Sequence, residues 1–203
     1  MLCDNWSGEP ARRLIDRNNP RPPRDDTMAT KKTSMFTLTE RLTISAANTQ
    51  TFATIDLGSY VDVGDRQALQ IHSVDFVHQG TNAIENFPVS TMGGSGAIMC
   101  QVTDLNRGGL VFVNDRALVA SSYLGYDTDA FLSNEADLFP DNYGKGSDDG
   151  RFVVNDQLYI SALSTAVASA KAVNITVRVN ASIVTLSSKD FMAIAIQSTA
   201  ADN

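Results

Sequence analysis

The sequence predicts an all-β protein, an antiparallel β-sandwich preceded by a flexible N-terminal arm. Three observations support this fold class. Residues 1–34 are rich in Pro and Arg and offer little to bury, apolar residues in 35–203 recur mostly with a period of two, and turn-forming Gly, Asn and Pro separate the apolar stretches. No repeat of about 20–50 residues is present, which argues against a solenoid or a propeller. The chain therefore divides into an arm, residues 1–34, and one β domain, residues 35–203.

Short alternations of apolar and polar residues mark the expected strands. These strands cover residues 36–44, 52–57, 68–78, 97–103, 110–113, 117–124 and 152–163. The longest alternation runs over Val173–Ile183, where apolar residues occupy the odd positions and Asn, Thr, Arg and Ser the even ones. Strict alternation over this length predicts one half-buried, antiparallel strand. About eight strands with long loops between some of them indicate two packed sheets.

The connections and the C-terminal segment complete this plan. Residues 80–96 are expected to form a long Gly-rich connection, and Asn106-Arg107-Gly108-Gly109 predicts a hairpin turn. Residues 125–150 are rich in Gly and acidic residues and show no sustained period, so we expect an exposed loop. Ser187-Ser188-Lys189-Asp190 is typical of a capped helix start and predicts a short closing helix over residues 191–197, with a last strand as the alternative.

Length and composition limit the classes of function. A body of this size buries roughly 70% of its unfolded surface, which is enough for one core. Cys3 and Cys100 give neither a disulfide framework nor a zinc-ligand spacing. No stretch approaches the ~20 apolar residues of a membrane span, and the N-terminus lacks a cationic region followed by an apolar one. We therefore expect a soluble protein without a secretory signal and without a membrane partner.

The sequence offers few candidates for catalysis. His72 and His78 are the only histidines, and their even separation predicts that they share one face of a strand about 20 Å apart, too far to bind one metal ion. The Gly93–Gly96 cluster places Ser95 among glycines, but a nucleophile elbow needs a preceding strand and a following helix. Because no nucleophile and base or metal triad can be assembled, we do not expect an enzyme.

The acidic segment supplies hard oxygen ligands of the kind that Ca²⁺ prefers. A calcium ion bridging neighbouring subunits would be bound by Asp127, Asp129, Glu135, Asp137 and Asp141. A solvated acidic loop without metal is the alternative, because the spacing does not match a helix-loop-helix calcium site. Phe131, Leu138, Phe139 and Tyr143 interrupt this segment and predict a buried contact, either with another chain or with the body of the same chain.

The arm and the body carry opposite charge. Residues 1–34 contain seven Lys and Arg against five Asp and Glu, whereas residues 35–203 contain nine against eighteen. The cations expected to contact nucleic-acid phosphates are Arg12, Arg13, Arg17, Arg21, Arg24, Lys31 and Lys32. A plain disordered tail and an arm that links subunits are the alternatives. Met28 also has the context of a start, and a chain beginning there would lack five of the seven cations.

A cationic arm, a β body with long loops and a long C-terminal strand together resemble the single jelly-roll coat proteins of small icosahedral viruses. The stretch Val173–Gln197, with Leu186-Ser187-Ser188-Lys189-Asp190-Phe191, looks like the closing segment of such coats. The resemblance implies a capsid subunit that assembles with identical copies around a genome, is soluble in the host cell before assembly and is then part of the virion. From charge and loop length we expect the arm to face the interior of such a shell, with residues 80–96 and the acidic segment at contacts between subunits or on the exterior. The arm is less basic than in many such coats.

Two other functions remain open from the sequence. A virion accessory protein, such as a head-decoration or tail protein, is also β-rich and oligomeric. A carbohydrate-binding β-sandwich would expose aromatic side chains, whereas the single Trp, Trp6, lies in the arm and the five Tyr are scattered. Formation of a closed shell separates the first alternative from a capsid subunit, and a glycan array separates the second.

Overall fold

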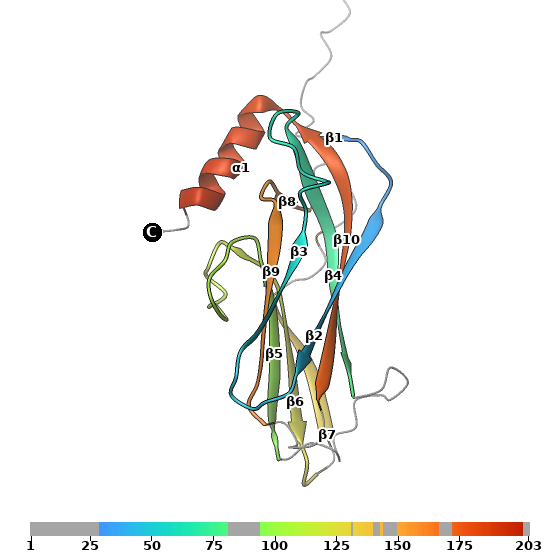
Figure 1. Cartoon of the computed structure of the whole chain (residues 1–203), viewed down its shortest axis with the longest axis vertical. Coiled ribbons are helices and arrows are strands. Elements are labelled where there is room, and N and C mark those ends of the chain that lie inside the picture. The colour runs from blue at the N-terminus through green and yellow to red at the C-terminus, as the bar shows by residue number, and fades with distance from the viewer. Residues whose placement is uncertain are drawn as a thin grey trace, which may run out of the picture.

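Two antiparallel sheets pack face to face in the computed structural model of the chain (Figure 1). The structure describes residues 29–80, 94–130, 132–139, 143, 150–166 and 172–200. Sheet A consists of β1 (Ala29–Lys31), β2 (Phe36–Ile44), β4 (Gln67–Gln79), β8 (Arg151–Val153) and β10 (Val173–Leu186). Sheet B consists of β3 (Thr51–Asp56), β5 (Gly96–Thr103), β6 (Leu118–Asp127), β7 (Leu132–Phe139) and β9 (Gln157–Ser164). The helix α1 (Ser188–Ala200) follows β10.

The order of the strands is that of a jelly roll. Sheet A has the order β2-β10-β4-β8 and sheet B the order β3-β9-β5-β6, so that successive strands of the chain repeatedly cross between the sheets. This arrangement is the eight-stranded double Greek key. Two short additions extend it, since β1 pairs with the far end of β10 and β7 pairs with the edge strand β6. The predicted all-β, two-sheet jelly roll is therefore confirmed.

The inward-facing residues of both sheets form the core. On β10 the odd-numbered residues from Val173 to Ala181 are buried, as the alternation predicts. Large side chains that are fully buried in this core include Ile44, Leu57, Leu69, Ile71, Ile98, Leu158, Ile160 and Ile175. Cys100 is also buried here, and desolvation raises the pKa of its thiol. The described side chains thus fill the space between the sheets in the manner of a packed interior.

A bulge in β4 reverses the faces of this strand at its middle. Asn180 of β10 pairs with Ser73 but the next residue, Ala181, pairs with Ile71, which leaves His72 as the extra residue. Ile71 and Val74 therefore both face the core although they are three residues apart. A sequence pattern with one constant period cannot show this change of face.

Helix α1 covers the outer face of sheet A at one end of the sandwich (Figure 1). Val184 and Leu186 of β10 point outward there and are buried in a second cluster with Ala29 of β1 and Phe191 of α1. Ser187 caps the helix, because its Oγ accepts a hydrogen bond from the Asp190 amide at 3.2 Å and donates one to the Asp190 carboxylate at 2.5 Å. The predicted closing helix is confirmed over its alternative, a last strand.

Two segments differ from the sequence-based prediction. Residues 110–113 were expected to be a strand, but they lie in the connection between β5 and β6. Residues 125–150 were expected to be an exposed loop, but β6 extends to Asp127 and β7 occupies Leu132–Phe139. β7 is an edge strand with one neighbour, and polar and acidic residues are characteristic of such edges. β1 lies within the segment predicted to be the arm.

Candidate functional site

The two histidines lie on opposite faces of sheet A, contrary to the prediction from their spacing. The bulge at His72 turns this side chain to the outer face, where its Nε2 lies 2.9 Å from Ser182 Oγ. His78 lies beyond the bulge, and its side chain faces the interior and sheet B. The two imidazoles therefore belong to separate environments.

His72 and Ser182 form a serine–imidazole pair that the sequence analysis did not find. Ser182 Oγ lies 2.9 Å from His72 Nε2 and 3.3 Å from Gln70 Oε1, and the imidazole tautomer decides which atom donates in the first of these contacts. Ser182 is completely buried, and His72 and Gln70 are almost completely buried. This geometry satisfies polar groups next to the bulge and does not present a nucleophile to a substrate.

His78 forms a contact between the sheets at their other end. Its Nδ1 lies 3.6 Å from a carboxylate oxygen of Glu135 on β7, and the Glu135 carboxylate also accepts a hydrogen bond from Ser122 at 3.5 Å. Burial lowers the pKa of His78 to about 4. The carboxylate favours the charged imidazole, but about half of Glu135 is exposed to solvent, so desolvation of the imidazole dominates.

Asp127 and Glu135, two of the predicted calcium ligands, point to opposite faces of sheet B. Asp127 Oδ1 caps a turn by accepting hydrogen bonds from the amide of Ala130, from Ser95 Oγ and from the amide of Asp129, and these bonds lower the pKa of Asp127. Glu135 instead faces His78 in the interior. Within the described residues no three His, Cys, Asp or Glu gather as a metal site. The side chain of Asp137 and all of Asp141 lie outside the described residues, so a calcium site that includes them stays a prediction.

Ser95 does not have the environment of a nucleophile. Its Oγ donates to Asp127 at 3.0 Å and accepts a hydrogen bond from the amide of Thr128 at 3.0 Å. The strand β5 follows directly, where a nucleophile elbow would need a helix. Ser95 therefore joins the start of β5 to the turn after β6.

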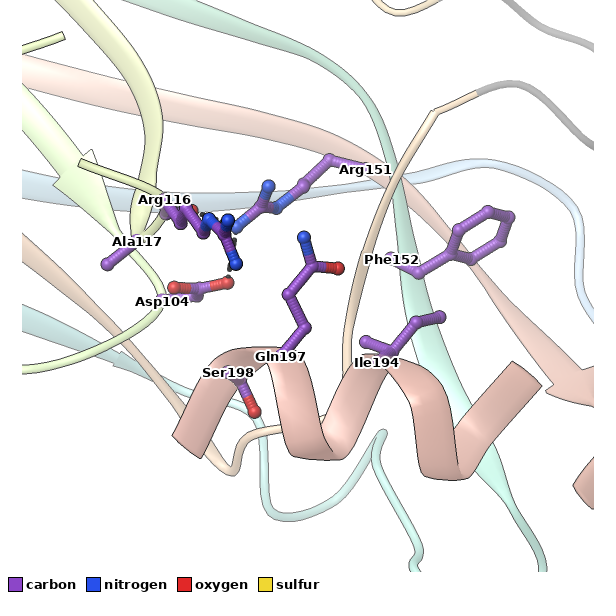
Figure 2. Close-up of a pocket in the computed structure, with 8 residues that line it drawn as sticks. All are labelled: Asp104, Arg116, Ala117, Arg151, Phe152, Ile194, Gln197 and Ser198. Carbon is purple, nitrogen blue, oxygen red and sulfur yellow. Dashed lines mark hydrogen bonds and ion pairs between the residues drawn. The ribbon is translucent and has the colours of Figure 1, made fainter. Parts of the chain in front are cut away.

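A small polar cavity of about 110 Å³ lies between α1 and the adjacent end of the sandwich (Figure 2). An Arg151 nitrogen lies 2.7 Å from Asp104 Oδ2 and donates to the Arg116 carbonyl at 2.6 Å, which ties sheet A to the end of β5. Burial raises the pKa of Asp104, and the Arg151 guanidinium opposes this shift. Among the described residues, Asp104 Oδ1 and Arg151 Nε are buried without a protein partner, and a cavity of this size has room for a few water molecules that would satisfy them. The α1 residues Ile194, Gln197 and Ser198 close the cavity.

Most predicted arm residues fall outside the part of the chain that the structure describes. Arg12, Arg13, Arg17, Arg21 and Arg24 are among these residues. Lys31 is exposed on β1, and the amide of Lys32 donates to the Ile183 carbonyl. Both lysines therefore lie at the α1 end of the sandwich, where Ala29 pairs with Leu186. Nucleic-acid binding by the arm stays a prediction.

Of the predicted apolar contacts in the acidic segment, the structure describes the side chain of Tyr143. Its ring packs against the core, its amide donates to the His72 carbonyl, and its hydroxyl donates to the Val119 carbonyl. Tyr143 thus anchors its segment on the body of the same chain. Phe131 and the side chains of Leu138 and Phe139 lie outside the described residues.

The most exposed large apolar side chain of the described part lies in a segment that was predicted to be a strand. Phe112 is 87% exposed in residues 104–117, which we call the Phe112 loop. Phe52, on the outer face of sheet B, is 56% exposed. In the sequence, the exposed position of Phe112 could have been inferred only from the apolar run 110–113, and a short apolar run does not distinguish a buried strand from an exposed contact surface.

In the described residues no helix is long and apolar enough to cross a membrane.

No protein-family model matches the chain, and no curated protein matches its sequence. Solved structures with a similar arrangement of strands include VP1 of Trichodysplasia spinulosa-associated polyomavirus in complex with sialylated precision glycooligomers. This match has 10% sequence identity and a TM-score of 0.43, and it covers 78% of this chain and 97% of that chain. The Merkel cell polyomavirus VP1 unassembled pentamer matches at 9% identity and a TM-score of 0.44, covering 79% and 99%. At these identities and TM-scores the likeness extends no further than the arrangement of strands.

Proposed function

We propose that the chain is a structural subunit that assembles with identical copies into a closed shell around a viral genome. The observation that carries this proposal is the double Greek key, the order β2-β10-β4-β8 over β3-β9-β5-β6, with an interior filled by its own side chains. Jelly rolls occur in capsid subunits, lectins and cupins. A filled core leaves no room between the described strands for the ligand that a cupin encloses, so the outer surface and the loops carry the function.

The two ends of the sandwich differ in a way that suits a shell. Ala29, the first described residue of the arm, pairs with Leu186, and Gln79, before the long connection, pairs with Asn174. These positions are twelve residues apart on β10, about 40 Å in an extended strand. The chain ahead of Ala29 and the connection after Gly80 therefore leave the described sandwich at opposite ends, which would give the subunit an inner and an outer surface.

The arm supplies the proposed contact with the genome. Its Lys and Arg side chains would contact phosphates without sequence preference, and each contact releases counterions. The body has twice as many acidic as basic residues in 35–203, so it would repel a polyanion over most of its surface. Nucleic-acid content should therefore depend on the arm.

Imaging of the purified full-length chain tests the proposal. We expect electron microscopy and sedimentation velocity to show uniform closed particles, and nuclease-protected nucleic acid in particles from the full chain but not from a chain starting at Met28. Monomers at every salt and protein concentration would refute the proposal. Rings or trimers that never close would support a virion accessory protein instead.

A further inference from the structure

We infer that the Phe112 loop and Phe52 together form a contact surface for a second copy of this chain. This inference rests on the proposed function and names the surface that one subunit presents to the next. The loop folds back over the outer face of sheet B, where the Gln101 side chain of β5 binds Val111 and where Gly109 lies against Gln50, two residues before Phe52. Gln101 and Phe52 are separated by one strand, β9, whose Ser161 pairs with Phe52 on one side and with Gln101 on the other.

The structure holds this loop in one conformation through several independent contacts. The Gln101 side chain, on the outer face of β5, accepts a hydrogen bond from the Val111 amide at 2.7 Å and donates one to the Val111 carbonyl at 2.9 Å. An ion pair between Arg107 and Asp115, at 3.2 Å, closes the loop at its base. Gly109 fits against Gln50, because an added Cβ would lie 2.6 Å from Gln50 Oε1. A preorganised loop loses little further freedom when it binds.

The apolar area that Phe112 and Phe52 expose is large enough for the centre of a protein–protein interface. Phe112 and Phe52 are 87% and 56% exposed, and since an aromatic side chain presents about 150–250 Å², the two rings together expose roughly 250 Å². A stable contact buries about 800 Å² on each partner, with a few large anchors near its centre. The two rings supply such anchors, and the surrounding loop and strands supply the rim.

The charges of the loop favour another copy of this acidic chain as the occupant. Residues 104–117 contain two acids and two arginines, and each acid has a basic partner, Arg151 for Asp104 and Arg107 for Asp115. Residues 35–203 as a whole carry nine more acidic than basic residues. Two copies therefore repel each other over most surfaces, whereas an apolar surface with balanced charge lets them approach.

A charge placed on the loop tests this surface against a matched control. Phe112→Asp should reduce the fraction of protein in assembled particles at least tenfold, and Phe52→Asp should act in the same direction. Val63→Asp introduces the same charge at an apolar residue that is 68% exposed in the connection between β3 and β4, and it should assemble as the unmodified chain does. Near-ultraviolet circular dichroism and the thermal midpoint of each variant confirm that the monomer is folded.

A photoreactive benzoylphenylalanine at position 112 tests the contact directly in purified protein. Irradiation should produce a covalent dimer, and mass spectrometry should locate the link on a second copy. Normal assembly of Phe112→Asp, equal loss in Val63→Asp, or no covalent dimer from assembled material would overturn the inference while leaving a shell subunit intact. Failure of the unmodified chain to assemble would instead remove the proposed function.

Discussion

At the scale of single residues, the core is apolar and the polar groups within it are few and mostly paired. His78 is an exception, because its Nε2 is buried without a hydrogen-bond partner among the described residues and a Glu135 carboxylate oxygen lies 3.6 Å from Nδ1. A buried neutral imidazole resists protonation, which makes the stability of the fold depend on pH.

We expect His78 to weaken the fold as the pH falls from about 6.5 toward 4. The pKa of His78 is about 4 in the folded chain against 6.5 in the unfolded chain, so on acidification the unfolded chain binds the proton first. The contribution of His78 to stability is therefore complete above pH 6.5 and is lost as the pH falls toward 4. The difference in unfolding free energy between the unmodified chain and His78→Gln should change by up to about 1.4 kcal/mol per pH unit in this range. Urea titrations at several pH values measure it, and parallel curves for the two proteins would contradict the assignment.

Ile160 tests the core at the centre of sheet B. It is fully buried on β9, which has β3 on one side and β5 on the other. Ile160→Ala should lower the free energy of unfolding by about 2–5 kcal/mol, since it removes buried methyl groups and leaves a cavity. Val63→Ala, at an exposed position, should change it by no more than about 0.5 kcal/mol, and denaturant unfolding of both variants provides the comparison.

At the scale of elements, α1 is fixed by its cap and by its apolar contacts with sheet A. Phe191, Ile194 and Ala195 pack on the cluster that contains Val184 and Leu186. The same helix closes the polar cavity at Asp104 and Arg151. Loss of α1 would therefore expose both an apolar cluster and an ion pair between the sheets.

Removal of the cap at Ser187 should destabilise α1 without unfolding the sandwich. Ser187→Ala should cost about 1 kcal/mol and should increase amide hydrogen exchange in residues 188–198, because the Asp190 amide loses its acceptor. Ser187→Thr keeps a hydroxyl at the cap and should restore most of the protection. Equal exchange in Ser187→Ala and the unmodified chain would show that packing alone holds the helix.

Elements with strong local patterns were predictable from the sequence, whereas features that depend on contacts between strands were not. The alternation predicted for Val173–Ile183 is present in the structure as far as Ala181, and the cap at Ser187 appears where it was expected. The bulge at His72 depends on the register between β4 and β10, and the position of residues 110–113 depends on Gln101, so neither has a local signal. β7 was missed because an edge strand needs no apolar face of its own.

At the scale of the whole molecule, charge opposes the proposed assembly. The chain has a net charge of −7, and the arm, with two more basic than acidic residues, offsets only part of the charge of the body. Apolar contacts between copies must therefore overcome repulsion that depends on ionic strength.

Assembly should consequently improve as salt rises. Between about 50 and 500 mM NaCl the Debye length falls from roughly 14 to 4 Å, so the concentration of free subunits in equilibrium with particles should decrease. Light scattering and sedimentation at a fixed protein concentration measure this change. If particles that lack the arm and hold no nucleic acid instead dissociate as salt increases, attraction between opposite charges, rather than apolar contact, holds the subunits together.

The pairing of β1 with the far end of β10 has a practical consequence for engineering. A peptide fused ahead of Ala29 and an epitope inserted after Gly80 would leave the sandwich at opposite poles, because Gly80 accepts a hydrogen bond from Asn174 while Ala29 lies beside Leu186. In the proposed shell, one polypeptide would then carry a cargo on the inside and an antigen on the outside. The position of β1 at one end of β10 thus keeps the two attachment points on opposite ends of the sandwich.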